Sequence, residues 1–391
     1  MKGKLKMKDS MTGRERLTKT FKGEKVDRIS VSPFLWANNV YEMFKYTPTI
    51  DKNLYPDDFD FSQKYVEYAD HFGFDVLFSL GLLWENFIPP SAENWEVTVE
   101  KEGDADKQKR TTIIKTPEGE LKQIQNFSRS SKHLIVFAHQ EYPIKTKKDF
   151  EIFAKYAPPA QYVDLDIIKS AKKATGDRGL VNPAVMGAFN TLNQFRKLED
   201  MMMDPIMDEG FYREMMEFFT EWNIKHFVDD VIPAGSDAIE LGGNLATSGV
   251  GPQFFKDYVM DYENRFAKAI HDAGAFVVYH NCGDAQTIMH LYNELDIDVW
   301  GYVTGPPFGD VVLDDVLKII RPDMALRGNI DQVEFLRKAT VAEVKERVKE
   351  LLEKVKPRGS WILSCSDFFF DGTPYENIFA LTEAGIEFGQ Y

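Results

Sequence analysis

The second half of the sequence repeats one pattern, a short apolar run followed by a stretch with helical periodicity. The apolar runs are expected to be strands at Ala238–Leu241, Phe276–His280, Val299–Val303, Met324–Gly328 and Trp361–Ser364. The helices between them are expected to begin near Pro252, Ala285, Leu313 and Thr340. Strands that alternate with helices form parallel sheets, because each helical crossover returns the chain to the same edge. The pattern therefore predicts an α/β fold with a parallel sheet.

The first half adds three strands to these five. They are expected within Ile29–Phe34, Asp75–Gly81 and Gly179–Gly187, and a first helix is expected over Thr12–Phe21, with Thr12 and Glu15 as its capping pair. Eight parallel strands favour a closed (β/α)8 TIM barrel. An open doubly wound sheet is the alternative, but no GxGxxG motif follows the first strand, so a dinucleotide-binding version is disfavoured.

One segment breaks the alternation of strand and helix. Trp95–Val99 and Thr111–Ile114 each alternate polar and apolar residues, and the charged run 100–110 separates them. Period-two alternation on both sides of a polar turn predicts an antiparallel β-hairpin. We expect this hairpin, at about 95–125, to be inserted into a single (β/α)8 domain that spans residues 1–391.

Composition limits the classes of partner. Hydrophobic residues make up 43% of the chain and charged residues 28%, as in a folded globular protein. The formal net charge of −15 disfavours binding to nucleic acid or to anionic membranes. No secretory signal or membrane-spanning run is visible, so a cytoplasmic location is expected.

The two cysteines of the chain both lie where a predicted strand ends. One occurs in His280-Asn-Cys282-Gly283 and the other in Ser364-Cys365-Ser366-Asp367. Strand ends of a parallel barrel share one face, where barrel enzymes carry their active sites. An imidazole and two thiolates are suitable ligands for zinc, and three protein ligands leave a position open for a substrate. Buried cysteines are more often inert apolar residues, which is the competing interpretation. Glu240, at the end of a neighbouring strand, is a candidate for the fourth position.

Several segments resemble a known superfamily. They are Arg14–Leu17, Phe21–Arg28, Gly251–Lys256, Ala269–Gly274, His280–Gly283, Arg327–Asp331 and Ile362–Ile378. This pattern resembles the uroporphyrinogen decarboxylase superfamily. The decarboxylases carry an arginine-rich motif after the first strand, whereas this chain has no arginine between Arg28 and Arg110 and carries Phe34-Leu-Trp36-Ala-Asn-Asn39 instead. In the corrinoid-linked methyltransferase branch, a His-x-Cys motif and a distant cysteine bind zinc, and His280, Cys282 and Cys365 match them.

The resemblance implies a zinc-dependent methyltransferase that acts with a partner corrinoid protein. The expected reaction moves a methyl group from a small methoxylated aromatic, similar to vanillate, veratrol or guaiacol, to the cob(I)alamin of that partner. Transfer from methylcobalamin to a thiol is the first alternative, and a decarboxylase-like activity is the second.

The resemblance also guides the assignment of the remaining site residues. Phe34, Trp36, Phe368 and Phe370 are expected to line the substrate pocket, with Asn329 as a further substrate-binding residue. Glu240, Tyr279 and Asp367 are the candidates for proton donors or for groups that orient the substrate.

Overall fold

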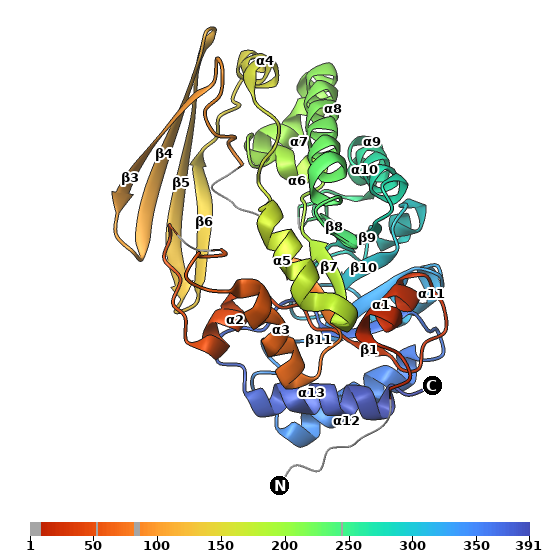
Figure 1. The fold of residues 1–391 in the computed structure, drawn as a ribbon. Helices are drawn as coiled ribbons and strands as arrows, with labels where there is room; N and C mark the ends of the chain where they lie inside the picture. Colours follow the sequence, from red (N-terminus) through yellow and green to blue (C-terminus); the bar gives the residue numbers. More distant parts are fainter. Residues whose placement is uncertain (1–8, 52–53, 82–86, 244) are drawn as a thin grey trace.

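The computed structural model describes residues 9–51, 54–81, 87–243 and 245–391, and a ring of parallel strands forms its centre (Figure 1). The described residues contribute eight strands to this ring. They are β1 (Ser30–Val31), β2 (Val76–Leu80), β7 (Gly179–Pro183), β8 (Ala238–Gly242), β9 (Phe276–His280), β10 (Val299–Val303), β11 (Ala325–Ile330) and β12 (Trp361–Cys365). Each overlaps a strand predicted from the sequence.

Hydrogen bonds close the ring of strands. Six strands pair in the order β1-β12-β11-β10-β9-β8, and β2 pairs with β7. Between β1 and β2, the Asp75 backbone N–H donates to Val31 O at 2.9 Å. Between β7 and β8, Ala184 and Glu240 form a parallel bridge. The predicted closed barrel is therefore confirmed, and the open sheet is excluded.

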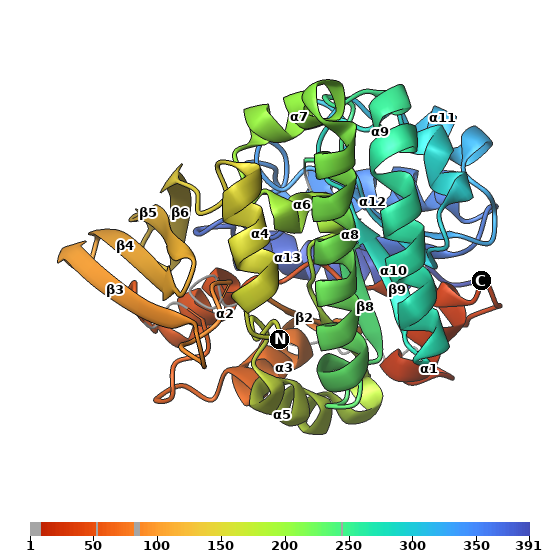
Figure 2. The same ribbon diagram turned by 90° about the horizontal axis from the view of Figure 1, so that it is seen from above.

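Helices surround the barrel, as the view from above shows (Figure 2). The α-helices are α1 (Gly13–Phe21), α2 (Ala37–Phe44), α3 (Phe61–Phe72), α4 (Lys147–Tyr156), α5 (Leu165–Thr175), α6 (Ala188–Leu192), α7 (Leu198–Met207), α8 (Glu209–His226), α9 (Pro252–Tyr258), α10 (Met260–Asp272), α11 (Leu313–Ile319), α12 (Val341–Val355) and α13 (Tyr375–Phe388). Of the helices that the structure describes, none is long and apolar enough to cross a membrane.

Three of the four helices predicted between the later strands begin where the sequence predicts them, near Pro252, Leu313 and Thr340. The helix expected near Ala285 is instead a short 3₁₀ helix, η4 (Met289–Glu294). The Asp310 carboxylate accepts the backbone N–H groups of Ala285 and Gln286, at 2.7 and 2.9 Å, and so holds this stretch as a turn. At the other end of the chain, the capping pair of α1 is confirmed, because Thr12 and Glu15 exchange side-chain to backbone hydrogen bonds.

The insertion is larger than the predicted hairpin. It is a four-stranded antiparallel sheet of β3 (Glu96–Gly103), β4 (Lys107–Thr116), β5 (Gly119–Ser131) and β6 (Leu134–Glu141), in sequential order. The sheet lies to one side of the barrel in both ribbon views (Figures 1 and 2). The predicted strand Trp95–Val99 overlaps β3, the predicted strand Thr111–Ile114 falls within β4, and two further strands follow them.

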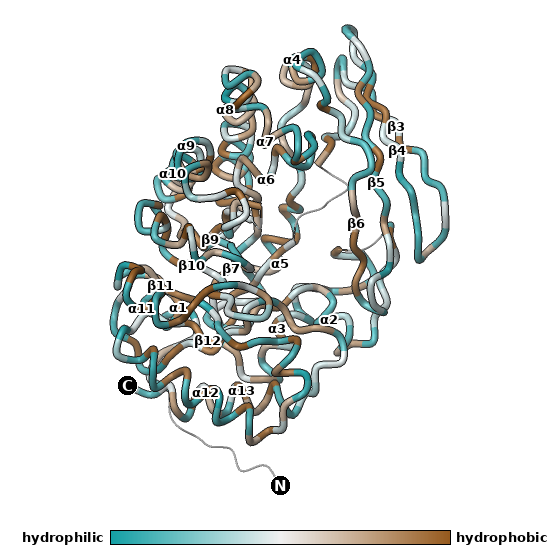
Figure 3. The backbone as a smooth tube through the Cα atoms, turned by 180° about the vertical axis from the view of Figure 1, so that it is seen from behind, coloured by the Kyte–Doolittle hydropathy of each residue, from teal (hydrophilic) through white to brown (hydrophobic). Residues whose placement is uncertain are grey.

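Barrel-strand residues alternate between the interior of the ring and the outer helices. Ala238, Val278 and Ile362 share one buried interior cluster with side chains of the other strands. Leu363 faces outward, because a Cβ added at Gly385 of α13 would lie 2.6 Å from Leu363 Cδ2. In α12 and α13, teal and brown segments succeed each other along the tube, as expected for helices that bury one face (Figure 3). Side chains two residues beyond an interior position again face the interior.

Candidate active site

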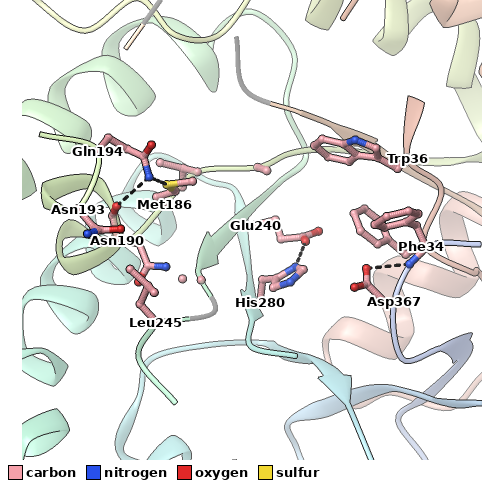
Figure 4. A pocket seen from close by; sticks show the side chains of 15 residues that line it. Phe34, Trp36, Met186, Asn190, Asn193, Gln194, Glu240, Leu245, His280 and Asp367 are labelled. Carbon is pink, nitrogen blue, oxygen red and sulfur yellow. Dashed lines mark hydrogen bonds and ion pairs between the residues drawn. The ribbon is translucent and has the colours of Figure 1, made fainter. Parts of the chain in front are cut away.

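A cavity of about 410 Å³ opens at the carboxyl ends of the barrel strands, near β7 and β8 (Figure 4). Its apolar walls are formed by Phe34, Trp36, Met186, Leu245 and Phe368, and its polar lining by Glu240, His280, Asp367, Asn190, Asn193 and Gln194. Pockets of this size with apolar walls and a few convergent polar groups are typical of small-molecule sites. Six residues predicted from the sequence, three of them aromatic, therefore meet in one cavity.

The buried Glu240 and the partly buried His280 form a pair at the base of the cavity. Both lie two residues beyond an interior position, Ala238 on β8 and Val278 on β9, so both face the barrel interior. His280 Nδ1 lies 2.6 Å from Glu240 Oε1, and Asn182 Nδ2 donates to Glu240 Oε2 at 2.7 Å. Both carboxylate oxygens are thus engaged, and the imidazole is held in one orientation.

Burial and hydrogen bonding compete in setting the protonation of this pair. Burial opposes the charged form of Glu240, but the hydrogen bond and the charge of His280 outweigh it and lower the pKa of Glu240. Burial also opposes the charged form of His280, but hydrogen bonds with Cys282 and Glu240 raise the pKa of His280 well above its ordinary value. Each side chain of the pair thus favours the charged form of the other.

Cys282 follows His280 in the turn after β9 and is hydrogen-bonded to it. The turn is fixed by Asn281, whose Nδ2 donates to Ala246 O at 2.9 Å and also to Tyr292 Oη. Gly283 then adopts a φ of +95°, which favours glycine. The local fold thus brings the predicted ligands His280 and Cys282 together.

Cys365 is not brought to this pair. It ends β12 on the same face as Leu363, which packs against α13, so its side chain points toward the outer helices. Its side chain is fully buried, and this burial raises the pKa of the thiol well above its ordinary value. Within the described ranges, no three His, Cys, Asp or Glu side chains are grouped closely enough to hold a metal ion. The role of Cys365 as a ligand stays a prediction.

Asp367, two residues after Cys365, does line the cavity. Figure 4 shows its carboxylate on the side of the cavity that faces His280. Burial raises the pKa of Asp367, against the opposing effect of the nearby His280 charge. One carboxylate oxygen accepts the Phe368 backbone N–H at 2.8 Å. Asp367 is thus the acidic side chain that the end of β12 presents to the predicted site.

Two other predicted residues lie elsewhere. Tyr279 is adjacent to His280 and therefore faces the outer layer, where its ring lies 5.4 Å from that of Tyr292. Asn329 lines a separate cavity of about 430 Å³ at the ends of β10 and β11, and its Nδ2 donates to Val303 O at 3.2 Å. The structure thus places neither side chain in the lining of the main cavity.

The predicted aromatic residues form a connected wall. The Phe34 ring centroid lies 5.9 Å from that of Trp36, 6.2 Å from that of Phe368 and 6.1 Å from that of His280. Phe370 does not line the cavity but stacks on Phe368, with centroids 5.4 Å apart. A flat ring in the cavity would therefore meet aromatic faces next to the polar pair.

Arg327 and Tyr302 support this wall and were not singled out from the sequence. Arg327 is fully buried, and its Nη1 donates to Tyr302 Oη at 2.6 Å. Its guanidinium carbon lies 4.6 Å from the Tyr302 ring and 5.8 Å from the Phe34 ring. An arginine inside a predicted strand of a barrel was the available signal, because a buried charge needs hydrogen-bonding partners.

The loop after β12 is tied to both α2 and the inserted sheet. Asp371 accepts hydrogen bonds from Asn38 Nδ2 at 2.9 Å, Ser131 Oγ at 2.6 Å and the His133 backbone N–H at 3.3 Å. Ser131 and His133 flank the turn between β5 and β6. The insertion therefore helps to position the loop that carries Asp367 and Phe368.

Comparisons with known proteins agree with this architecture. The sequence model of the uroporphyrinogen decarboxylase (URO-D) family matches residues 137–388. Among solved structures, a methyltransferase from Methanosarcina mazei superposes with a TM-score of 0.70 at 17% sequence identity, covering 97% of this chain and 99% of that one. An exo-beta-1,4-mannosidase, Op5Man5 from Opitutaceae bacterium strain TAV5, gives a TM-score of only 0.37 at 15% identity over 59% of this chain and 51% of that one. No curated protein matches.

Proposed function

This chain belongs to the uroporphyrinogen decarboxylase family, and from its cavity we propose that it is a zinc-dependent methyltransferase acting on methoxylated aromatic compounds. The proposed acceptor is the cob(I)alamin of a partner corrinoid protein. The observation that carries this proposal is the aromatic wall of Phe34, Trp36 and Phe368 beside the His280 and Glu240 pair. The methyltransferase with a similar fold supports the reaction class.

The wall suits an aromatic substrate better than a porphyrinogen. Ring faces stack or meet edge to face at centroid distances of about 4.5–7 Å, as the wall residues already do with one another. A cavity of about 410 Å³ accommodates a single substituted ring with its methyl ether. The segment after β1 provides Phe34 and Trp36 at the position where the decarboxylases are expected to carry arginines.

The side chains at and beside the base of the cavity are of the types that zinc prefers, and binding would require three of them to move closer together. His280 is oriented through Nδ1 by Glu240, so Nε2 is the nitrogen that would hold zinc, and hydrogen-bonded carboxylates of this kind are usual partners of zinc-binding histidines. Cys282 is its neighbouring sulfur donor. Asp367 faces the same cavity from the loop after β12, so we favour its carboxylate over the outward-facing Cys365 as the third donor. When bound, zinc supplies a Lewis acid that polarises the ether oxygen.

The protein residues have distinct parts in the proposed reaction. The bond between the methyl carbon and the aryl oxygen breaks, a bond between that carbon and cobalt forms, and the aryl oxygen leaves as a phenolate that is protonated on release. Phe34, Trp36 and Phe368 orient the ring so that the methyl group faces the mouth of the barrel. Glu240 is a positioning residue, because it acts through His280.

The test is a methyl-transfer assay with purified, zinc-loaded protein. Reduced cobalamin and a methoxylated aromatic should give methylcobalamin and the free phenol in equal amounts. Transfer only from methylcobalamin to thiols would favour the thiol-directed activity instead. Release of carbon dioxide from a porphyrinogen, without methyl transfer, would contradict the proposal and indicate a decarboxylase.

A further inference from the structure

A second cavity, the one lined by Asn329, lies beside the main cavity at the carboxyl ends of the barrel strands. The two cavities meet at the segment after β12, because Ser366 lines the second cavity and the next residue, Asp367, lines the main one. The second cavity has a volume of about 430 Å³, close to that of the main cavity. Its wall includes the apolar residues Pro306, Val311 and Phe335, and its two charged residues are Asp331 and Arg347.

Arg347 reaches the second cavity from α12 and has no carboxylate partner among the described residues. Its Nη2 donates to Asn329 Oδ1 at 3.5 Å, and this amide is held in place because its Nδ2 donates to Val303 O. Glu343 and Glu350 lie four residues before and three residues after Arg347, at spacings that commonly form ion pairs along a helix, but neither pairs with it. The guanidinium is thus directed to the cavity and not to the acidic neighbours on its own helix.

Asp331 brings the opposite charge to the same cavity. Its Oδ1 accepts the backbone N–H groups of Val333 and Glu334, at 2.7 and 2.9 Å, which fixes the side chain in a turn. Its Oδ2 accepts no hydrogen bond from the residues that the structure describes, and the side chain is only partly buried. Within the same described residues, Asp331 and Arg347 line one cavity without forming an ion pair with each other.

We infer that the second cavity binds a small zwitterion, an α-amino acid with an apolar side chain. Its carboxylate would lie on Arg347, because a guanidinium donates paired hydrogen bonds to a carboxylate. Its ammonium would lie on Asp331, because an ammonium only donates and an ionised carboxylate only accepts. The apolar side chain would pack on Val311 and Phe335. This inference is independent of the proposed methyl transfer, since no residue lines both cavities.

Ligands that carry a single charge fit the second cavity less well. An anion such as phosphate would lie beside the carboxylate of Asp331, in a chain whose formal net charge is −15. A cation would be opposed by the guanidinium of Arg347, which would also stay without a counter-charge. Only a ligand with both charges satisfies both side chains.

Three probes that share one side chain test this inference. They are L-leucine, L-leucinamide and N-acetyl-L-leucine, which at pH 6 are a zwitterion, a cation and an anion, each titrated calorimetrically into the purified protein. L-leucine should bind about tenfold more tightly than either of the others, as expected when one hydrogen-bonded charge contact is lost. Absence of L-leucine binding, or equally tight binding of either singly charged probe, would overturn the inference.

Two substitutions assign the two charges of the ligand. Arg347→Met should weaken the binding of L-leucine about tenfold and leave that of L-leucinamide unchanged. Asp331→Asn keeps the Oδ1 acceptor of the turn but removes the charge, so it should weaken L-leucine and L-leucinamide and spare N-acetyl-L-leucine. The probe that each variant still binds shows that the variant is folded.

The control for these substitutions is Arg337→Met, at an exposed arginine outside the second cavity. It should leave all three affinities at their wild-type values. Wild-type affinity for L-leucine in Arg347→Met or in Asp331→Asn would contradict the assignment of that residue as a contact of the ligand.

Competition distinguishes the second cavity from the main one. Because the two linings share no residue, 4-methoxyphenol, offered as a ligand of the main cavity, should leave the affinity for L-leucine unchanged. Mutually exclusive binding of the two compounds would place L-leucine in the main cavity and overturn the inference. Neither outcome bears on the transfer assay, so the proposed function and the zwitterion site stand or fall separately.

Discussion

At the scale of single residues, the pairing of Glu240 with His280 determines what the site can bind. The carboxylate takes up Nδ1, so a metal at this site would be held through Nε2. Glu240→Gln replaces the charge that supports the imidazole, and partners of this kind contribute about 10-fold to 100-fold to metal affinity. We therefore expect the zinc affinity of the variant, measured by competition with a chelator, to be about 10-fold to 100-fold lower than that of the wild type. Glu334→Gln, at an exposed ion pair with Lys338, is the control, and equal zinc affinity in both variants would contradict this role.

The third zinc donor is a second question at this scale. Because Asp367 lines the cavity and Cys365 faces the outer helices, Asp367→Ala should lose most of its zinc while Cys365→Ala retains it. Zinc content per chain, measured by mass spectrometry after dialysis, distinguishes the two. Loss of zinc from Cys365→Ala with full retention in Asp367→Ala would show that the end of β12 rearranges around the metal.

At the scale of elements, the inserted sheet and the loop after β12 act together through Asp371. Asp371→Ala removes the acceptor shared by Asn38, Ser131 and His133. Because small displacements of positioning groups strongly affect rate, we expect kcat/KM to fall about tenfold or more. Asp104→Ala, in the turn between β3 and β4, should leave kcat/KM unchanged. Steady-state kinetics compare the two, and an unaffected Asp371→Ala would exclude a positioning role for the insertion.

The barrel was predictable at this scale, whereas the extent of the insertion was not. Barrel strands are buried on both faces, so they appear as continuous apolar runs that the sequence displays directly. In β5 and β6, burial alternates with exposure along strands of mixed composition, and the signal is weaker. The run of five hydrophobic residues Leu134–Ala138, bounded by polar segments, was the available indication of a longer sheet.

The candidate site was predictable to the extent that it depends on strand ends. Glu240 and His280 were found because they lie near the ends of apolar runs, and Asp367 because it follows one. The direction of Cys365 was missed because one position along a strand reverses the face of the sheet, and the last paired residue is not visible in the sequence. Asn190 and Gln194 belong to a short helix and its following turn, and no motif marks them.

At the scale of the whole molecule, Glu263 links stability to pH. This residue of α10 is buried, its Oε2 has no partner among the described residues, and burial raises its pKa from 4.5 to about 8. Between these values the folded state holds a proton that the unfolded state has lost, so rising pH lowers the free energy of unfolding by about 1.4 kcal/mol per unit. The substitution Glu263→Gln removes the titrating carboxyl group and with it this pH dependence of the free energy of unfolding.

The variant Glu263→Gln should therefore exceed the wild type in stability at pH 8, and the difference should shrink as the pH falls toward 5. Urea denaturation of both proteins at a series of pH values measures it. A difference that does not vary with pH would show that Glu263 is ionised in the folded protein.

The central claim is that a methyl group leaves an aromatic ether in this barrel for the cobalt of a corrinoid. The most direct measurement is carbon-13 NMR of the zinc-loaded protein with reduced cobalamin and 4-methoxyphenol labelled in its methyl carbon. The account predicts that the label moves from the ether to a cobalt-bound methyl in the wild type and stays on the ether in His280→Ala. A label that remains on the ether with the wild-type protein, or that moves equally well without His280, would contradict it.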